Sequence, residues 1–141
     1  MAIERDLPGH PGRAAAALAA LMPSIGQATP AERRFVEALD GQARIATGRT
    51  ASALDLARRL DDESARTADP RARVASLLIR SAAETAGGHS ASAVAHALEA
   101  RSTAARIGDA DLGFWADMAH GTATRVRGQT EESLASLQHA L

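Results

Sequence analysis

The sequence contains no cysteine, no tyrosine and few aromatic residues of any kind, which make up 2% of the chain. Without cysteine there can be no disulfide framework and no thiolate metal site, and a reducing, cytoplasmic location is the simplest expectation. Few aromatic or β-branched runs remain from which strands could be built. These absences argue against a disulfide-stabilised scaffold and against an extensive β-sheet.

Charge of one sign is also missing, because the formal net charge is −1. Lysine is absent, and the arginines alternate with acidic residues along the chain. Nucleic-acid binding needs a concentrated basic face, so we expect no DNA or RNA partner. The Ala-rich stretch 14–21 is too short to cross a bilayer, and it follows charged residues and prolines, unlike a signal peptide. We therefore expect no membrane partner.

Alanine dominates what is present and accounts for about a quarter of the residues. It is the best helix former, and its small side chain lets helices approach closely. A chain of 141 residues is long enough for one domain with a hydrophobic core. The composition therefore predicts an all-α fold in a single domain over residues 1–141.

An internal repeat is the strongest pattern in the sequence. Gly48, Gly88 and Gly128 recur at intervals of about 40 residues, and similar residues follow each of them. Glycine can adopt the positive φ that ends a helix, so each is expected to form a tight turn between helices. The hydroxyl residue two positions later is expected to N-cap the next helix. These residues are Thr50, Ser90 and Thr130.

A second set of markers keeps the same spacing. Thr29, Asp69 and Asp109 are suited to N-cap helices, and Pro30 and Pro70 would occupy the first helical position. A glutamate three residues after Thr29 completes a capping box. Small residues also recur midway along the segments that follow, where a neighbouring helix could pack closely. They are Gly41, Ser81 and Gly121.

Together the markers predict about seven helices, arranged as an α-solenoid of stacked antiparallel helix pairs. The first would be the second helix of an incomplete repeat, because the segment after Gly12 is similar to the segment after Gly48. The expected ranges are 12–22, 30–47, 50–63, 70–86, 90–106, 110–127 and 130–141.

The pattern resembles the tetratricopeptide repeat, especially the longer variety of bacterial signalling proteins. The resemblance rests on 105–109, Gly121, Gly128 and 132–138, and extends over about residues 12–141. It implies a non-catalytic protein–protein interaction or dimerisation module, a regulatory arm of a protein such as a diguanylate cyclase or a LuxR-type regulator. The chain departs from the family in its aromatic positions, where only Phe35, Phe114 and Trp115 supply bulk.

In repeats of this kind the first helix of each pair lines the concave face. Residues equally spaced from the marker glycines would then form an apolar groove with a polar edge, suited to a peptide or helix. The alternative is that the large residues among them are core between helices. The candidate partner-binding residues are Phe35, Ala38, Gln42, Leu78, Thr85, Trp115, Met118, Thr122 and Arg125. Residues at the same distance from successive marker glycines form a row across the face, and Ile45, Ala75 and Ala82 complete these rows.

Other groups indicate no chemistry. His89 and His96 could share a helix face, but no carboxylate cluster accompanies them, so we expect no metal site. The acidic run 61–63 is interpreted as a solvated helix end rather than a cation site. The segment 87–90 resembles a phosphate loop but has no lysine or preceding strand. With no catalytic constellation either, we expect neither an enzyme nor a cofactor.

The two ends of the repeat array carry exposed leucines in this interpretation. Leu134, Leu137 and Leu141 fall on one face of the last expected helix, while terminal repeats usually present a polar cap. Either a longer chain continues the array, or these surfaces meet another copy as a homodimer. The expected partner is thus a protein or peptide. The alternative function is a sensor that binds a small molecule or short peptide in the groove.

Overall fold

The computed structural model describes residues 29–140, and this part of the chain contains five helices and no strand. They are α3 (Pro30–Ala46), α4 (Thr50–Thr67), α5 (Pro70–Ala86), α6 (Ser90–Ile107) and α7 (Ala110–Ala140). The prediction of an all-α fold is confirmed. The expected helix 12–22 lies outside the described residues. Over the same region, no helix is both long and apolar enough to cross a membrane.

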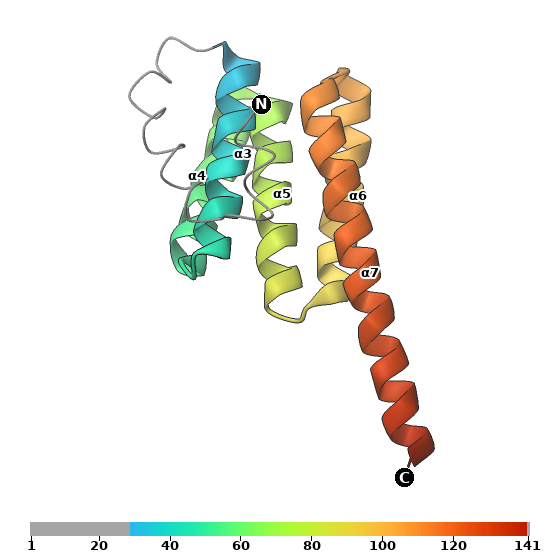
Figure 1. Cartoon of the computed structure of the whole chain (residues 1–141). Helices are drawn as coiled ribbons and strands as arrows, with labels where there is room; N and C mark the ends of the chain where they lie inside the picture. The colour runs from blue at the N-terminus through green and yellow to red at the C-terminus, as the bar shows by residue number, and fades with distance from the viewer. Residues whose placement is uncertain (1–28, 141) are drawn as a thin grey trace.

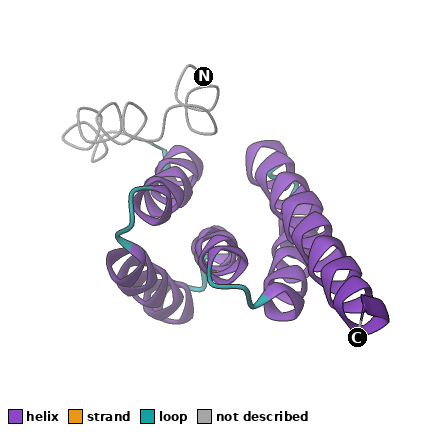
Figure 2. Cartoon of the chain, turned by 60° about the horizontal axis from the view of Figure 1, so that its bottom comes forward, coloured by secondary structure: helices purple, strands orange, loops and turns teal. Residues whose placement is uncertain are grey.

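Helix α5 is the centre of the arrangement. It packs against α3, α4, α6 and α7, and it contributes most of the large side chains that are fully buried. Helices α3 and α7 lie on either side of α5, while α4 and α6 cover its other face (Figure 2). The core therefore runs along α5, and one face between α3 and α7 is left uncovered by the described helices.

The helix starts follow the capping residues. The Thr29 hydroxyl accepts a hydrogen bond from the Glu32 amide at 3.2 Å, and the Glu32 carboxylate accepts one from the Thr29 amide at 3.0 Å. Asp69 and Asp109 accept from the amides of Arg71 and Leu112, both at 3.0 Å. Pro30 and Pro70 begin their helices. These three predicted N-caps are confirmed.

The turns at Gly48 and Gly88 are also confirmed, since both glycines have φ of +82°. In each turn the amide after the glycine donates to a carbonyl five residues earlier, from Arg49 to Arg44 and from His89 to Glu84. This is the Schellman pattern, which satisfies the last carbonyls of a helix. The expected hydroxyl caps are wrong, because the N-cap positions are Arg49 and His89, without a side-chain cap, and the hydroxyl residues are the first helical ones.

The predicted break at Gly128 is wrong. Helix α7 is continuous over its 31 residues and extends past the α5–α6 turn (Figure 1). The Thr130 hydroxyl donates to the Val126 carbonyl within the helix at 3.0 Å, so it does not cap a new one. The reason lies in packing, because α4 and α6 each lie against two other helices. A segment turning back after Gly128 would meet only α7 among the described helices, and that offers little burial to offset the lost helical bonds.

The residues expected at close helix contacts behave differently from one another. A Cβ on Gly41 would lie 2.3 Å from Ile79 Cγ1, so α3 and α5 meet there without a side chain between them. Ser81 is buried, and its hydroxyl donates to the Ala93 carbonyl at 2.9 Å, which joins α5 to α6. A Cβ on Gly121 would have no atom within 4 Å. The prediction is therefore right for two of these positions and wrong for Gly121.

Substitution of the repeat glycines should distinguish a turn from a continuous helix. Gly88→Ala should lower the free energy of unfolding by about 1–2 kcal/mol, because alanine must adopt the left-handed conformation there. Gly128→Ala should raise it by about 0.5–1 kcal/mol, because alanine is favoured inside a helix and a Cβ meets nothing at that position. Urea unfolding followed by circular dichroism measures both. A loss of stability in Gly128→Ala would contradict a continuous α7.

Candidate functional site

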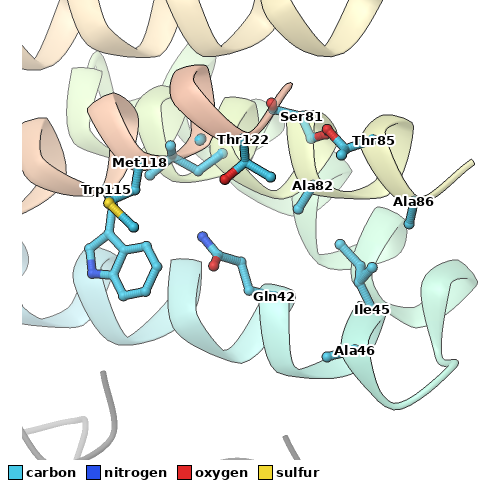
Figure 3. Close-up of a pocket in the computed structure, with 12 residues that line it drawn as sticks. Gln42, Ile45, Ala46, Ser81, Ala82, Thr85, Ala86, Trp115, Met118 and Thr122 are labelled. Carbon is cyan, nitrogen blue, oxygen red and sulfur yellow. The ribbon is translucent and has the colours of Figure 1, made fainter. Parts of the chain in front are cut away.

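A groove lies across α3, α5 and α7 and has a cavity volume of about 400 Å³. Its walls are mainly apolar, and each of the three helices contributes residues near equivalent positions of the repeat. Figure 3 shows the side chains of the three helices converging on the groove. The lining residues are Gln42, Ile45, Ala46, Leu78, Ser81, Ala82, Thr85, Ala86, Trp115, Met118, Ala119 and Thr122.

Six of the nine predicted partner-binding residues line this groove. They are Gln42, Leu78, Thr85, Trp115, Met118 and Thr122.

The other three lie elsewhere. Phe35 and Ala38 are buried in the core. The alternative interpretation is right for Phe35, Leu78 and Trp115, which all belong to the buried core cluster, although Leu78 and Trp115 also border the groove. Arg125 is exposed and lies about one turn beyond Thr122 along α7, outside the lining. Trp115 and Met118 occupy the repeat positions equivalent to Phe35 and Ala38 and do line the groove, so burial differs between equivalent positions of the repeat.

Two lining residues come from rows that the repeat register had already placed on this face, Ile45 and Ala82. Sequence reasoning missed Ala46, Ala86, Ala119 and, as a groove residue, Ser81. Ala46 and Ala86 are the last residues of α3 and α5, so the groove continues to the ends of both helices. The equal spacing of these two alanines was the signal that could have identified them.

Two of the polar side chains in the groove wall, Ser81 and Thr85, already have partners inside the chain. The Thr85 hydroxyl donates to the Ser81 carbonyl at 2.8 Å, and the Ser81 hydroxyl is engaged with α6. The Gln42 amide extends toward the Trp115 ring in Figure 3. The groove therefore offers a ligand mainly apolar surface, with Gln42 and Thr122 as the polar groups at hand.

Trp115 forms one end of the groove and is 8% exposed. Its ring meets Phe114 edge to face, with the ring centroids 6.0 Å apart. The indole nitrogen is buried and has no acceptor among the described residues. In Figure 3 it lies on the side of the ring away from Gln42, so the part of the indole that faces the groove is apolar.

The remaining candidate groups are engaged in structural contacts. His96 Nδ1 lies 2.8 Å from the Glu84 carboxylate across α5 and α6, while His89 is exposed at the preceding turn. Asp61 pairs with Arg73 at 2.8 Å and with Arg80 at 2.6 Å. Burial opposes ionisation of Asp61, but hydrogen bonds from these arginines lower its pKa. Residues 29–140 contain no group of three metal-binding side chains.

The acidic run 61–63 is thus not a solvated helix end, and that interpretation is corrected. Helix α4 continues to Thr67 and ends where Ala68 adopts a left-handed conformation, with φ of 55°. Within α4, both Asp61 and Glu63 point toward arginines of neighbouring helices. The physical reason is that α4 packs against both α3 and α5, so Asp61 and Glu63 reach arginines of these helices while Asp62 stays exposed.

One buried ion cluster was missed by sequence reasoning. Arg34 is 4% exposed and binds three carboxylates: Glu37 at 2.8 Å, Glu63 at 2.6 Å and Asp69 at 3.0 Å. Burial disfavours the charged guanidinium, but the hydrogen bonds outweigh it and raise the pKa of Arg34. The cluster joins α3 to α4 and to the start of α5. Arg71 repeats part of the pattern by binding Asp109 at 3.0 Å.

The residues expected to form a terminal apolar face lie on the free end of α7. Leu134 is 55% exposed and Leu137 is 62% exposed, while Leu141 lies outside the described residues. They are separate from the groove lining, although they belong to the same helix as Trp115 and Met118.

Compared with protein-family models, curated proteins and solved structures, the chain gives no significant match.

Proposed function

We propose that this chain is a non-catalytic interaction module that holds an apolar helical segment of a protein partner in the groove across α3, α5 and α7. The observation that carries the proposal is the groove itself, which is open, apolar and built from three helices. Partner helices commonly bind such grooves through residues on one face. A groove of this kind gives affinity by burying apolar surface, and it needs no catalytic group.

The wider role rests on the repeat. Helix pairs recurring every 40 or so residues favour an α-solenoid, and the chain resembles the longer tetratricopeptide repeats of bacterial signalling proteins. We accordingly propose a cytoplasmic regulatory arm, of the kind that diguanylate cyclases and LuxR-type regulators carry. Its task would be to bring a partner protein to the effector part of such a regulator.

A second candidate is a sensor for a small apolar molecule or short peptide. The cavity volume, about 400 Å³, lies within the range of about 300–1,000 Å³ that is usual for small-molecule sites. Such sites also have polar groups that fix the orientation of the ligand, and here the hydroxyls of Ser81 and Thr85 are engaged within the chain. The helix-binding function is therefore preferred.

Trp115 allows a direct test, because it is the only tryptophan in the chain and it lines the groove. Its fluorescence is followed while a synthetic Leu/Ala amphipathic helical peptide is added. The comparison peptide has the same composition with its leucines scattered around the helix. We expect a saturable spectral change with the amphipathic peptide and at least about tenfold weaker binding of the scattered one.

Two variants on different faces of α7, one inside the groove and one outside it, show where the peptide binds. Thr122→Arg places a charge in the groove and should weaken binding by at least about tenfold, whereas Thr124→Arg on the same helix should bind normally. Equal binding by both variants would show that the groove is not the site. If neither peptide binds but anilinonaphthalene sulfonate does, and Thr122→Arg prevents it, the small-molecule sensor would replace the helix-binding module.

A further inference from the structure

A second surface of α7 lies outside the groove and is exposed. Four residues spaced by three, four and three positions form a stripe along one side of the helix: Phe114, Asp117, Gly121 and Thr124. None of them lines the groove. Phe114 is 54% exposed, the Asp117 side chain is 62% exposed, and a Cβ on Gly121 would have no atom within 4 Å. We call these four residues the outer stripe of α7.

The same stripe is covered in the two earlier repeat units. The positions 40 and 80 residues before the outer stripe belong to α5 and α3, and the residues at all of them are buried or half-buried. They are Val74, Leu77, Ser81 and Glu84 in α5, and Arg34, Glu37, Gly41 and Arg44 in α3. The outer stripe is therefore the exposed copy of a surface that packs against other helices elsewhere in the chain.

On α5, the helix that follows in the sequence covers the stripe. The Ser81 hydroxyl donates to the Ala93 carbonyl of α6 at 2.9 Å, and the Glu84 carboxylate lies 2.8 Å from His96 Nδ1 of α6. Two of the four stripe positions thus contact α6 directly.

On α3, the following helix α4 covers the stripe in the same way. The Arg44 guanidinium donates to Ser52 Oγ at 3.0 Å near the α3–α4 turn, and the Arg34 guanidinium donates to the Glu63 carboxylate at 2.6 Å near the other end. Helix α5 also reaches the stripe, at Gly41. The two arginine contacts show that α4 runs antiparallel to α3 along the stripe.

The covering helices have small residues on their buried side, which let two helices approach closely. These residues are Ala53 and Ala57 in α4 and Ala93, Ala97 and Ala100 in α6. The α3–α4 pair is the closer template for α7, because α3 and α7 both have an acidic residue at the second stripe position and a glycine at the third. At the second position, the charge of Arg59 on α4 acts to lower the pKa of Glu37. At the first position, Phe114 stands where α3 has Arg34.

We propose that the outer stripe is a second protein-binding surface, which takes an antiparallel helix of a partner protein in the position that α4 has on α3. The stripe defines that helix: small residues opposite Gly121, an arginine near Asp117 and an apolar residue against Phe114. The end of the chain's own α7 does not take this position, because the helix is continuous and leads away from the stripe (Figure 1). A separate helix covers the stripe without breaking α7. Because the stripe lies outside the groove, this second surface does not depend on the proposed function.

The probe is a synthetic peptide that copies residues 49–67, which include α4, with the substitution Glu63→Leu. Position 63 contacts the first stripe position on α3, and Phe114 occupies that position in α7. A lactam bridge between Ala51→Lys and Asp55, both on the exposed side of α4, keeps the peptide helical and lowers the conformational cost of binding.

Amide chemical shifts of the isotope-labelled full chain, followed by nuclear magnetic resonance during a titration, locate the peptide. We expect saturable shifts at Gly121 and its neighbours on α7. Gly121→Arg should weaken binding by at least about tenfold, because its side chain blocks the close approach of the two helices. Its fold should persist, as circular dichroism would check, because a Cβ there would have no atom within 4 Å. Thr122→Arg, in the wall of the groove, should bind the peptide as the wild type does.

The peptide itself provides a second comparison. The version that keeps Glu63 should bind at least about tenfold more weakly than the Glu63→Leu version, because its charge would lie against the Phe114 ring. A version with Ala53→Arg should also bind more weakly, since Ala53 of α4 is fully buried and a large side chain there keeps the helices apart.

The outcomes separate the outer stripe from the groove. Binding that is lost in Thr122→Arg and kept in Gly121→Arg would place the peptide in the groove, which would overturn the second surface and support the proposed function. No shift at Gly121 with up to about 1 mM peptide would also overturn the second surface, and would leave the groove function intact. Self-association of the chain without peptide, prevented by Gly121→Arg, would show that a second copy covers the stripe in place of a partner protein.

Discussion

Replacing Arg34 with methionine should lower the free energy of unfolding by about 3–5 kcal/mol, the usual cost of removing one partner from a buried ion pair. Arg34 is almost fully buried and is bound by Glu37, Glu63 and Asp69. Methionine fills similar space but offers no hydrogen bond, so the three carboxylates lose a shared donor. The loss reflects mainly the carboxylates left behind.

The pH dependence of the loss of stability in Arg34→Met should show whether the carboxylates left behind cause it. The Arg34 hydrogen bond lowers the pKa of Glu63, so this stabilisation is present above the unfolded-state pKa and is lost as the pH falls through the folded-state pKa. Burial raises the pKa of Glu37 and Arg34 opposes that rise, so in Arg34→Met, where Arg34 no longer opposes burial, protonation of Glu37 relieves a larger penalty than it does in wild type. Both effects should narrow the difference between wild type and Arg34→Met between about pH 7 and pH 3.

Urea unfolding at a series of pH values measures this difference. Arg58→Met is the control, because Arg58 and its partner Asp55 are largely exposed and such pairs contribute little, so the change should stay within about 0.5 kcal/mol. Arg34→Lys should fall between the two, since lysine keeps the charge but cannot reach three carboxylates with a planar fork. A constant difference from pH 7 to pH 3 would show that the cost arises from lost packing and not from the uncompensated carboxylates.

The sequence predicted the helix boundaries best where a boundary depends on local chemistry. Thr29, Asp69 and Asp109 cap their helices because an oxygen and an amide two or three residues apart are enough to form the bond. Gly48 and Gly88 turn for similarly local reasons. Gly128 has a similar local sequence but lies within α7, because whether a turn forms there depends on what the following segment can pack against.

The groove could be predicted because the repeat register is regular. Equal spacing brought Gln42 of α3, Leu78 of α5 and Thr122 of α7 to one face, and these residues do line one cavity. How deeply each of these residues is buried could not be predicted, because burial depends on how closely the helices pack around that residue. Phe35 is therefore in the core, while Met118 is half exposed on the same face.

The Arg34 cluster was beyond sequence reasoning for a different reason. Its partners Glu63 and Asp69 are far from Arg34 along the chain, and an acidic run such as 61–63 is usually solvated. Only the packing of α3 against α4 and α5 brings them to Arg34. The hint in the sequence is that arginines precede two N-cap aspartates at similar distances, Arg34 before Asp69 and Arg71 before Asp109.

Gly41→Ala should destabilise the protein, against the usual preference of helices for alanine over glycine. A Cβ at this position would lie 2.3 Å from Ile79 Cγ1 and 2.5 Å from its Cδ1. Ile79 is fully buried, so it has little room to move aside. Overpacking typically costs about 1–3 kcal/mol, and the gain in helix propensity of about 1 kcal/mol offsets part of it.

Gly121 provides the matched control, because it occupies the equivalent position two repeat units later and a Cβ there would have no atom within 4 Å. Gly121→Ala should therefore keep the propensity gain and raise the free energy of unfolding by up to about 1 kcal/mol. The same substitution at equivalent positions thus has opposite expected signs. If both variants were stabilised, α3 and α5 would not be in close contact at Gly41.

A double-mutant cycle completes the argument. Ile79→Ala alone should cost about 2–5 kcal/mol, because it leaves a cavity in the core. In that background Gly41→Ala meets no clash, fills part of the cavity and gains helix propensity, so the double variant should be about 1 kcal/mol more stable than Ile79→Ala. The sign of Gly41→Ala therefore reverses with the residue at position 79. Additive effects in urea unfolding would mean that the two side chains do not touch, and that the close approach of α3 to α5 is not what requires a glycine there.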